Sequence, residues 1–227
     1  MDAAEGLTVI VAGECDALRS ALISAFSDGG AQIMTIGPAT DDHALSSPGA
    51  ARRDGHFVVD CGCEKSMREA CERIVEARSG KLVLIALVDR LDQGPLETIT
   101  LDRWRESFGT AVETPLVLTL GLMEAMLADN WGRIIAIVGN SGNEDVQGMA
   151  RLTAEAGLIG LVRALASDLG QSGVTANAVV RGGPERADCV PADPCSSDGD
   201  FVASAVALAT YLAGSESGML SGQTLRA

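Results

Sequence analysis

The stretch GRIIAIVGNSGNEDVQGMARLTAEAGLIGLVRALASDLGQSGVTANAVV, residues 132–180, decides the fold of this chain. It opens with a short apolar run at residues 133–138, which is typical of a buried strand. Residues 146–169 have a length that favours a helix, and residues 174–180 form a second apolar run. This order predicts two parallel strands of one sheet, joined by a right-handed crossover.

The rest of the chain repeats this alternation, without an internal repeat or a linker. We therefore expect one α/β domain over residues 1–227, a Rossmann-like doubly wound parallel sheet of about seven strands with helices on both faces. The other predicted strands are residues 7–13, 31–36, 56–60, 81–88 and 223–227. The other predicted helices are residues 16–27, 64–78, 102–129 and 201–212, with a short helix and loop over residues 40–54.

Composition limits the class of partner. The chain is 47% apolar and carries a net charge of −14. An acidic surface repels phosphate backbones and anionic lipids, so neither nucleic acid nor membrane is expected as a partner. No apolar run reaches the ~18 residues that a membrane span needs, and residues 116–127, which come closest, indicate a buried helix. The first seven residues lack the basic segment of a secretory leader, which favours a cytoplasmic protein.

The cysteines favour free thiols over disulfides or metal. No two of them form a C-x-x-C pair, and reduced thiols are the rule in the cytoplasm. Cys61 and Cys63 with His56 suggest a metal site, but they lack the second ligand pair of a zinc site. No metal is predicted. The six cysteines are Cys15, Cys61, Cys63, Cys71, Cys189 and Cys195.

Four segments resemble the short-chain dehydrogenase/reductase family over nearly the whole chain. The stretch at residues 132–180 is similar to the family's catalytic half, with GRIIAI and GVTANAVV as strands and AGLIGLVRALASDLG as a helix. The run VIVAG before a helix lies at the family's dinucleotide turn. LVLIALVD at residues 82–89 precedes Trp104 at the family's spacing of fifteen residues, and SGQTLRA at residues 221–227 resembles the last strand. The resemblance implies a Rossmann-like fold and NAD(P)-dependent alcohol oxidation or ketone reduction.

The catalytic positions that the resemblance identifies hold other residues. The family's Asn position is Ala111, its Ser position is Gly139, and its Tyr-x-x-x-Lys pair falls on Arg151 and Glu155. In the family the Tyr phenol exchanges a proton with the substrate, and the Lys ammonium lowers the pKa of that phenol. A guanidinium does not titrate near neutrality, and a carboxylate raises the pKa of a neighbouring acid. We expect no catalytic residue in this chain, because its one tyrosine and two lysines lie elsewhere.

The family's dinucleotide turn, Thr-Gly-x-x-x-Gly-x-Gly, keeps only its first glycine here, Gly13. Ala17 and Arg19 replace the other two glycines, which allow pyrophosphate to approach the backbone. Arg19 is expected to be too large for its position, and Glu14 and Asp16 place carboxylates beside the phosphates. We therefore expect no NAD(P) on this chain.

Asp60 is the one position of the cofactor site that matches the family. There an Asp closes the adenine pocket. The alternative is that Asp60 caps the helix that follows it.

The predicted helices at residues 102–129 and 146–169 carry apolar residues on more than one face. One apolar stripe is enough to cover a sheet, so the extra width suggests a partner. In the resembled family these two helices form a four-helix bundle across a dimer axis. The candidate interface residues are Leu122, Met126, Leu152, Ile159 and Leu165.

These observations favour a catalytically inactive short-chain dehydrogenase subunit. It would join an active paralogous subunit, which binds the NAD, in a heterodimer or heterotetramer that acts as an alcohol dehydrogenase. The resemblance suggests an acyl-CoA hydroxy substrate, such as 2-(hydroxybenzyl)succinyl-CoA. Two alternatives are a stand-alone enzyme with non-redox chemistry at Arg151 and Glu155, and a regulator that senses a ligand in the vestigial cofactor cleft.

Overall fold

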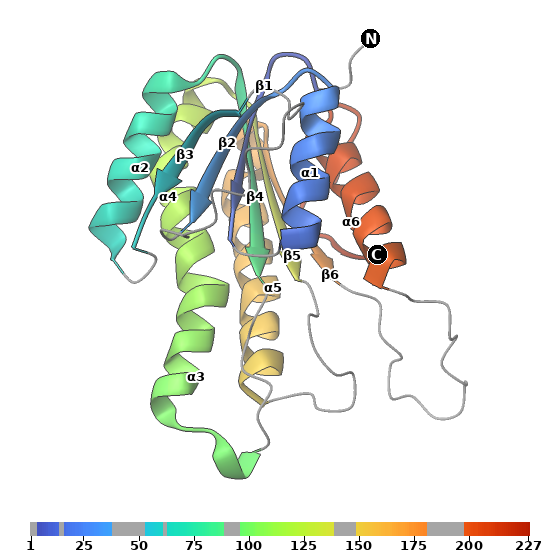
Figure 1. Ribbon diagram of the computed structural model, residues 1–227. Helices are drawn as coiled ribbons and strands as arrows, with labels where there is room; N and C mark the ends of the chain where they lie inside the picture. Colours follow the sequence, from blue (N-terminus) through green and yellow to red (C-terminus); the bar gives the residue numbers. More distant parts are fainter. Residues whose placement is uncertain are drawn as a thin grey trace.

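The predicted Rossmann-like fold is confirmed in the computed structural model, which describes residues 4–13, 16–37, 53–60, 63–88, 96–138, 149–180 and 198–227. Seven parallel strands form one sheet in the order β3-β2-β1-β4-β5-β6-β7 (Figure 1). The strands are β1 (Leu7–Ala12), β2 (Gln32–Gly37), β3 (Arg53–Val58), β4 (Lys81–Val88), β5 (Gly132–Val138), β6 (Val174–Val180) and β7 (Thr224–Arg226).

Helices cover both faces of the sheet (Figure 1). One apolar core lies between the sheet and α2, α4 and α5, and a second lies between the sheet and α1 and α6. The central strands β1, β4, β5 and β6 are buried almost throughout, as expected for parallel strands covered on both sides. The helices are α1 (Asp16–Asp28), α2 (Glu64–Ala77), α3 (Leu101–Phe108), α4 (Thr114–Ala128), α5 (Met149–Leu169) and α6 (Asp198–Ala213).

The predicted long helix at residues 102–129 is present, but it contains a π turn. The helix α3 runs through η3 (Gly109–Glu113), the π turn, into α4. Thr100 begins it, because its hydroxyl accepts a hydrogen bond from the backbone N–H of Arg103. By length and composition alone Leu101–Ala128 could span a membrane. Its inner face instead packs on the sheet and on neighbouring helices, as in the core of a globular domain.

Two predicted boundaries are wrong. β3 runs over Arg53–Val58 rather than residues 56–60, because it is an edge strand on which exposed His56 and Val58 flank buried Phe57. The helix α6 begins at Asp198, three residues before its predicted start. The helix and loop predicted over residues 40–54 lie outside the described residues, apart from the first two residues of β3.

Candidate functional site

Ligands of open parallel sheets bind beyond the carboxyl ends of the strands. The sequence-predicted site residues that the structure describes lie at that edge or on the helices that extend past it. Gly13 follows β1, Ala111 lies on η3, and Glu155 lies on the first half of α5. Glu14 and Gly139 lie outside the described residues.

Ala111 lies inside the π turn and is fully buried. Its methyl group belongs to the same apolar core as Ala154 and Leu158 of α5. A π turn widens a helix and frequently occurs at a functional site. Here the side chain on the π turn can neither donate nor accept a hydrogen bond, so the position cannot support a proton relay through its side chain.

Gly157 of α5 brings the two long helices together at this level. A Cβ at Gly157 would lie 3.1 Å from Cγ2 of Val112 and 3.2 Å from Cε2 of Phe108. The ring of Phe108 stacks on Trp104, with 5.2 Å between the ring centroids. The wall of the site is therefore an apolar contact between α3, η3 and α5.

Arg151 and Glu155 occupy the positions of the family's Tyr and Lys on α5. They are four residues apart, so they lie on one side of the helix. Glu155 is half-buried, and the side chain of Arg151 lies outside the described residues. A carboxylate and a guanidinium cannot replace a phenol whose pKa an ammonium lowers. Proton transfer of the family's kind therefore has no donor at these two positions.

Gly13 is retained for the packing of the sheet. Its φ is +110°, and a Cβ at this position would collide with the carbonyl oxygen of Leu87 on β4. Any other residue is strained here, whether or not a ligand binds. The surviving glycine therefore gives no support for a bound dinucleotide.

Arg19 fits its position, contrary to the prediction that no side chain would. Only 8% of Arg19 is exposed. Its side chain runs from the first turn of α1 across Gly37, the last residue of β2, and a Cβ on Gly37 would lie 3.7 Å from its Nη1. Nη2 lies 3.5 Å from Nδ1 of His56 on β3, which is 2.8 Å from Oγ1 of Thr35.

Arg19 lies close to the place where dinucleotide-binding folds hold the adenosine ribose. In dinucleotide-binding folds the residue that binds the adenosine ribose lies about twenty residues after the glycine-rich turn, at the end of the second strand. Gly37 ends β2 here, and the Arg19 guanidinium lies against it. Arg19 therefore takes space next to the ribose position, and the absence of a cofactor from this chain stays a prediction. Ala17 is exposed, and the side chain of Asp16 is outside the described set.

Asp60 lies exposed beyond β3, three residues before the N-cap of the next helix. Cys63 is the N-cap of α2, without a side-chain hydrogen bond to the helix. The Asp60 N–H donates to Oγ of Ser66 at 3.1 Å, and the Asp60 carbonyl accepts from the N–H of Cys63 at 2.9 Å. Asp60 is therefore not the N-cap residue of α2, and a capping role for its side chain stays a prediction.

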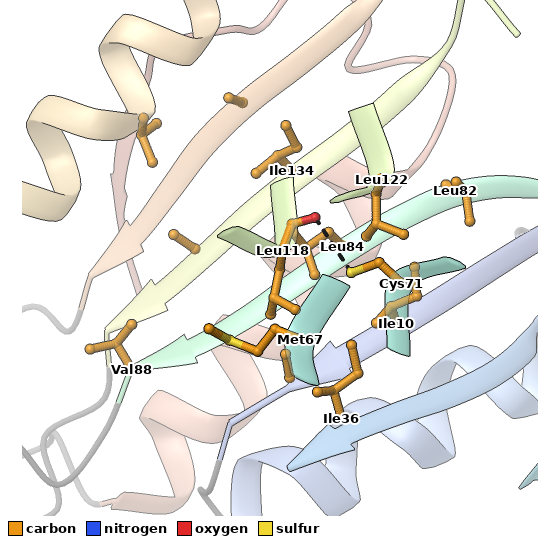
Figure 2. Packing of buried hydrophobic residues seen from close by; sticks show 14 of the residues in the cluster. Ile10, Ile36, Met67, Cys71, Leu82, Leu84, Val88, Leu118, Leu122 and Ile134 are labelled. Carbon is orange, nitrogen blue, oxygen red and sulfur yellow. Dashed lines mark hydrogen bonds between the residues drawn. The ribbon is translucent and has the colours of Figure 1, made fainter. Parts of the chain in front are cut away.

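Leu122 and Met126 are wrong as interface candidates. Both are fully buried in the chain's own core, and Figure 2 shows Leu122 beside Leu82, Leu84 and Cys71. The sequence could not tell inner from outer faces, because α4 is apolar on all sides.

The side chains of the other interface candidates are exposed to different degrees. Leu152 is 45% exposed, while Ile159 and Leu165 are half-buried. The structure adds Leu120, 38% exposed, and Met149, 43% exposed. Their role in assembly stays a prediction.

A cavity of about 730 Å³ lies at the opposite, amino edge of the sheet. Arg78, Lys81, Asp129 and Trp131 line it, together with the residues that follow α6. Arg78 and Asp129 form an ion pair there, and Lys81 lies 5.3 Å from the Trp131 ring centroid. The helices α2, α4 and α6 end at this cavity, so its cations balance the negative ends of helix dipoles.

Neither metal ligands nor paired thiols gather in the described part of the chain. It contains no cluster of three or more His, Cys, Asp or Glu residues that could hold a metal ion. Cys63 and Cys71 are free thiols. Cys61 lies outside the described ranges, so the C-x-C pair itself is not described.

Comparisons with known proteins identify the scaffold. The family described as short chain dehydrogenase matches residues 7–189. The 3-oxoacyl-(acyl-carrier-protein) reductase of Escherichia coli is 27% identical over 241 residues, which cover 97% of this chain and 95% of that protein. A Rhizobium meliloti protein named "Probable galactose dehydrogenase" is 26% identical over 182 residues, which cover 77% of this chain and 70% of that protein.

The fold has close counterparts among solved structures. A double mutant of a Serratia marcescens short-chain dehydrogenase/reductase superposes with a TM-score of 0.77 at 20% sequence identity, over 99% of this chain and 97% of that one. This likeness concerns the fold. The family match spans the chain from β1 through β6. The chain belongs to the short-chain dehydrogenase family.

Proposed function

We propose that this chain is a catalytically inactive subunit of the short-chain dehydrogenase family. It assembles with an active relative into a heterodimer or heterotetramer, and NAD and substrate bind to that relative. The observation that carries the proposal is the buried methyl group of Ala111 on the π turn, which packs against α5, the helix on which Glu155 stands where the family has an ammonium. The substrate, of which an acyl-CoA hydroxy intermediate is one candidate, is set by the active subunit.

The state of the cofactor turn supports the same conclusion. Gly13 is needed for packing against β4, and the Arg19 side chain lies where an adenosine ribose would bind. Loss of a single catalytic group would leave cofactor binding intact. Here the acid–base positions and the cofactor turn have both changed, as expected for a subunit that no longer needs to catalyse a reaction.

The outer surfaces of α4 and α5 supply a reason for the fold to be retained. Leu120 and Leu152 are exposed on neighbouring helices of one layer, where Met123 and Ile159 are only half-buried. Wide apolar surface on two adjacent helices is a feature of protein interfaces. We expect such an interface to bury more than ~1,200 Å² in total.

Co-expression with an intact short-chain dehydrogenase from the same genome tests the proposal. The tagged chain should retain the untagged relative through purification, and light scattering should give the mass of a mixed dimer or tetramer. Replacing Leu152 by Asp would bury an unpaired charge at the contact, which costs several kcal/mol. Leu152→Asp should therefore release the relative, whereas Thr153→Asp, an exposed change one residue away, tests how local the effect is.

Light scattering of the chain alone and with its relative also gives the opposing result. A stable monomer in both samples would contradict assembly, and a stand-alone role would then replace it.

A further inference from the structure

We propose that Arg19 is a built-in plug, whose side chain fills the adenosine end of the ancestral cofactor site and thereby excludes nucleotides. The plug deepens the proposed function, because it would give a physical reason why this subunit leaves the cofactor to its partner. The Arg19 side chain would exclude nucleotides by its volume as well as by its charge. Its effect can therefore be tested with a ligand that carries no charge.

The geometry shows how the side chain is held. Arg19 lies on α1, Gly37 ends β2 and His56 lies on β3, so the side chain crosses the carboxyl ends of two strands. The guanidinium can only donate, so a contact from Nη2 to Nδ1 of His56 requires that nitrogen to be unprotonated. Thr35 is also within hydrogen-bond distance of Nδ1, at 2.8 Å. These neighbours favour one conformation of Arg19 across the end of the sheet.

The Arg19 guanidinium lies in van der Waals contact with Gly37, at the end of β2. In this class of fold an acidic residue at the end of the second strand accepts a hydrogen bond from the ribose, or an Arg nearby accommodates a 2′-phosphate. Here a Cβ on Gly37 would lie 3.7 Å from Nη1 and 4.0 Å from Nη2 of Arg19. The guanidinium therefore lies at the end of β2, where the ribose would bind, and only 8% of Arg19 is exposed.

Asp60 is the polar residue that the resemblance assigns to the adenine end. It is exposed beyond β3, at the position that matches the family's adenine-pocket Asp. Removal of the plug should thus uncover a site that still has one of its polar groups. Adenosine is the appropriate probe, because it carries no charge and tests the adenosine end alone.

The test is calorimetric titration of adenosine into the whole chain and into variants of decreasing side-chain volume. Arg19→Lys keeps a side chain that is nearly as long, Arg19→Gln is shorter, and Arg19→Ala removes everything beyond Cβ. Adenosine affinity should stay undetectable in the wild type and in Arg19→Lys, and rise at least tenfold in Arg19→Ala, with Arg19→Gln between them. Arg163→Ala, at an exposed site on α5, is the matched control and should bind no adenosine.

Two results would overturn the plug. One is a folded Arg19→Ala or Arg19→Gln variant, by circular dichroism, that binds adenosine no better than the wild type. The other is an Arg19→Lys variant that binds as well as Arg19→Ala, because a side chain that fills the site would then not be the barrier. If Arg19→Ala does not fold, Arg19→Gln decides. Co-purification of the same variants with the active relative should be unchanged, so that failure of the plug and failure of assembly give different results.

Discussion

Arg133 is a buried guanidinium that joins the ends of two helices at the amino edge of the sheet. Only 3% of it is exposed, and burial lowers its pKa. Its Nη1 donates to the carbonyls of Gly132 at 2.9 Å and Gly173 at 3.2 Å, and its Nε donates to Gly214 at 3.3 Å. Gly173 follows η4 (Gly170–Ser172) after α5, and Gly214 follows α6, so this one side chain satisfies carbonyls at both helix ends.

We expect Arg133→Met to destabilise the chain. The change removes the guanidinium from three carbonyl groups, of which only Gly214 keeps another side-chain donor among the described residues, Ser217 Oγ at 3.0 Å. It also removes the contact with Trp131, whose ring centroid lies 4.3 Å from the guanidinium carbon. Unsatisfied buried groups of this kind cost about 1–3 kcal/mol each, so a total loss of roughly 2–4 kcal/mol is expected after partial rescue by water. Urea unfolding measures it, with exposed Arg163→Met as the control. Equal stability of the two variants would refute the structural role of Arg133.

The buried thiol of Cys71 should make the free energy of unfolding fall at alkaline pH. The thiol is fully buried beside Leu118, and burial raises its pKa from 9.0 to about 12 (Figure 2). The folded state therefore holds this proton more tightly than the unfolded state. The resulting stability is complete below pH 9.0 and is lost as the pH rises towards 12, on the order of 1.4 kcal/mol per pH unit.

Comparison with Cys71→Ala isolates this contribution. Both proteins are unfolded with urea at pH 8, 9 and 10. We expect the wild type to be the more stable at pH 8 and its advantage to shrink above pH 9, since alanine does not titrate. An advantage that stays constant from pH 8 to pH 10 would show that the thiol has no raised pKa. Native Cys71 should also resist thiol reagents, because the thiolate is the reactive form.

At the scale of elements, α4 shows why an apolar helix is ambiguous. Its sequence TPLVLTLGLMEAMLA has apolar residues on every side, so periodicity does not reveal which of them meet the sheet. The structure places Leu118, Leu122 and Met126 inward and leaves Leu120 38% exposed. Helix neighbours and the register of the sheet settle this orientation, and both depend on residues far away in the sequence.

The matched pair Leu120→Asp and Leu122→Asp separates folding from assembly. A carboxylate at Leu122 would lie inside the core without a partner, so the isolated chain should lose several kcal/mol of stability or fail to fold. A carboxylate at Leu120 faces outward, and the melting temperature of the isolated chain should hardly change. Only the complex with the active relative should be lost in Leu120→Asp. Retention of the relative by Leu120→Asp would exclude this face of α4 from the interface.

At the scale of the whole molecule, the order of strands and helices could be read from the sequence because β1, β4, β5 and β6 are apolar along their length. β3 could not be placed correctly, because an edge strand such as RDGHFV buries only alternate residues. The burial of Arg19 could not be predicted from the sequence either. It depends on Gly37 and His56, which lie 18 and 37 residues further along the chain and meet it only in the folded sheet.

Simple repair of the catalytic positions should not restore an enzyme. The triple variant Gly139→Ser, Arg151→Tyr, Glu155→Lys supplies the family's acid–base groups but leaves Ala111, Ala17 and Arg19 in place. We expect no reduction of generic ketones with NADH or NADPH, measured by loss of absorbance of the reduced cofactor. Cofactor-dependent turnover by this variant would mean that the altered dinucleotide turn still binds cofactor. Addition of Arg19→Gly to the triple variant would then show how much Arg19 weakens cofactor binding.

Native mass spectrometry of the co-expressed complex tests the central claim most directly, because it counts subunits and bound cofactors in the same particle. With NAD in excess, the account predicts a mixed dimer or tetramer that carries one cofactor for each active subunit and none for this chain. A complex with one cofactor on every subunit would contradict the loss of the cofactor site. A spectrum in which this chain is present only as a monomer would contradict assembly.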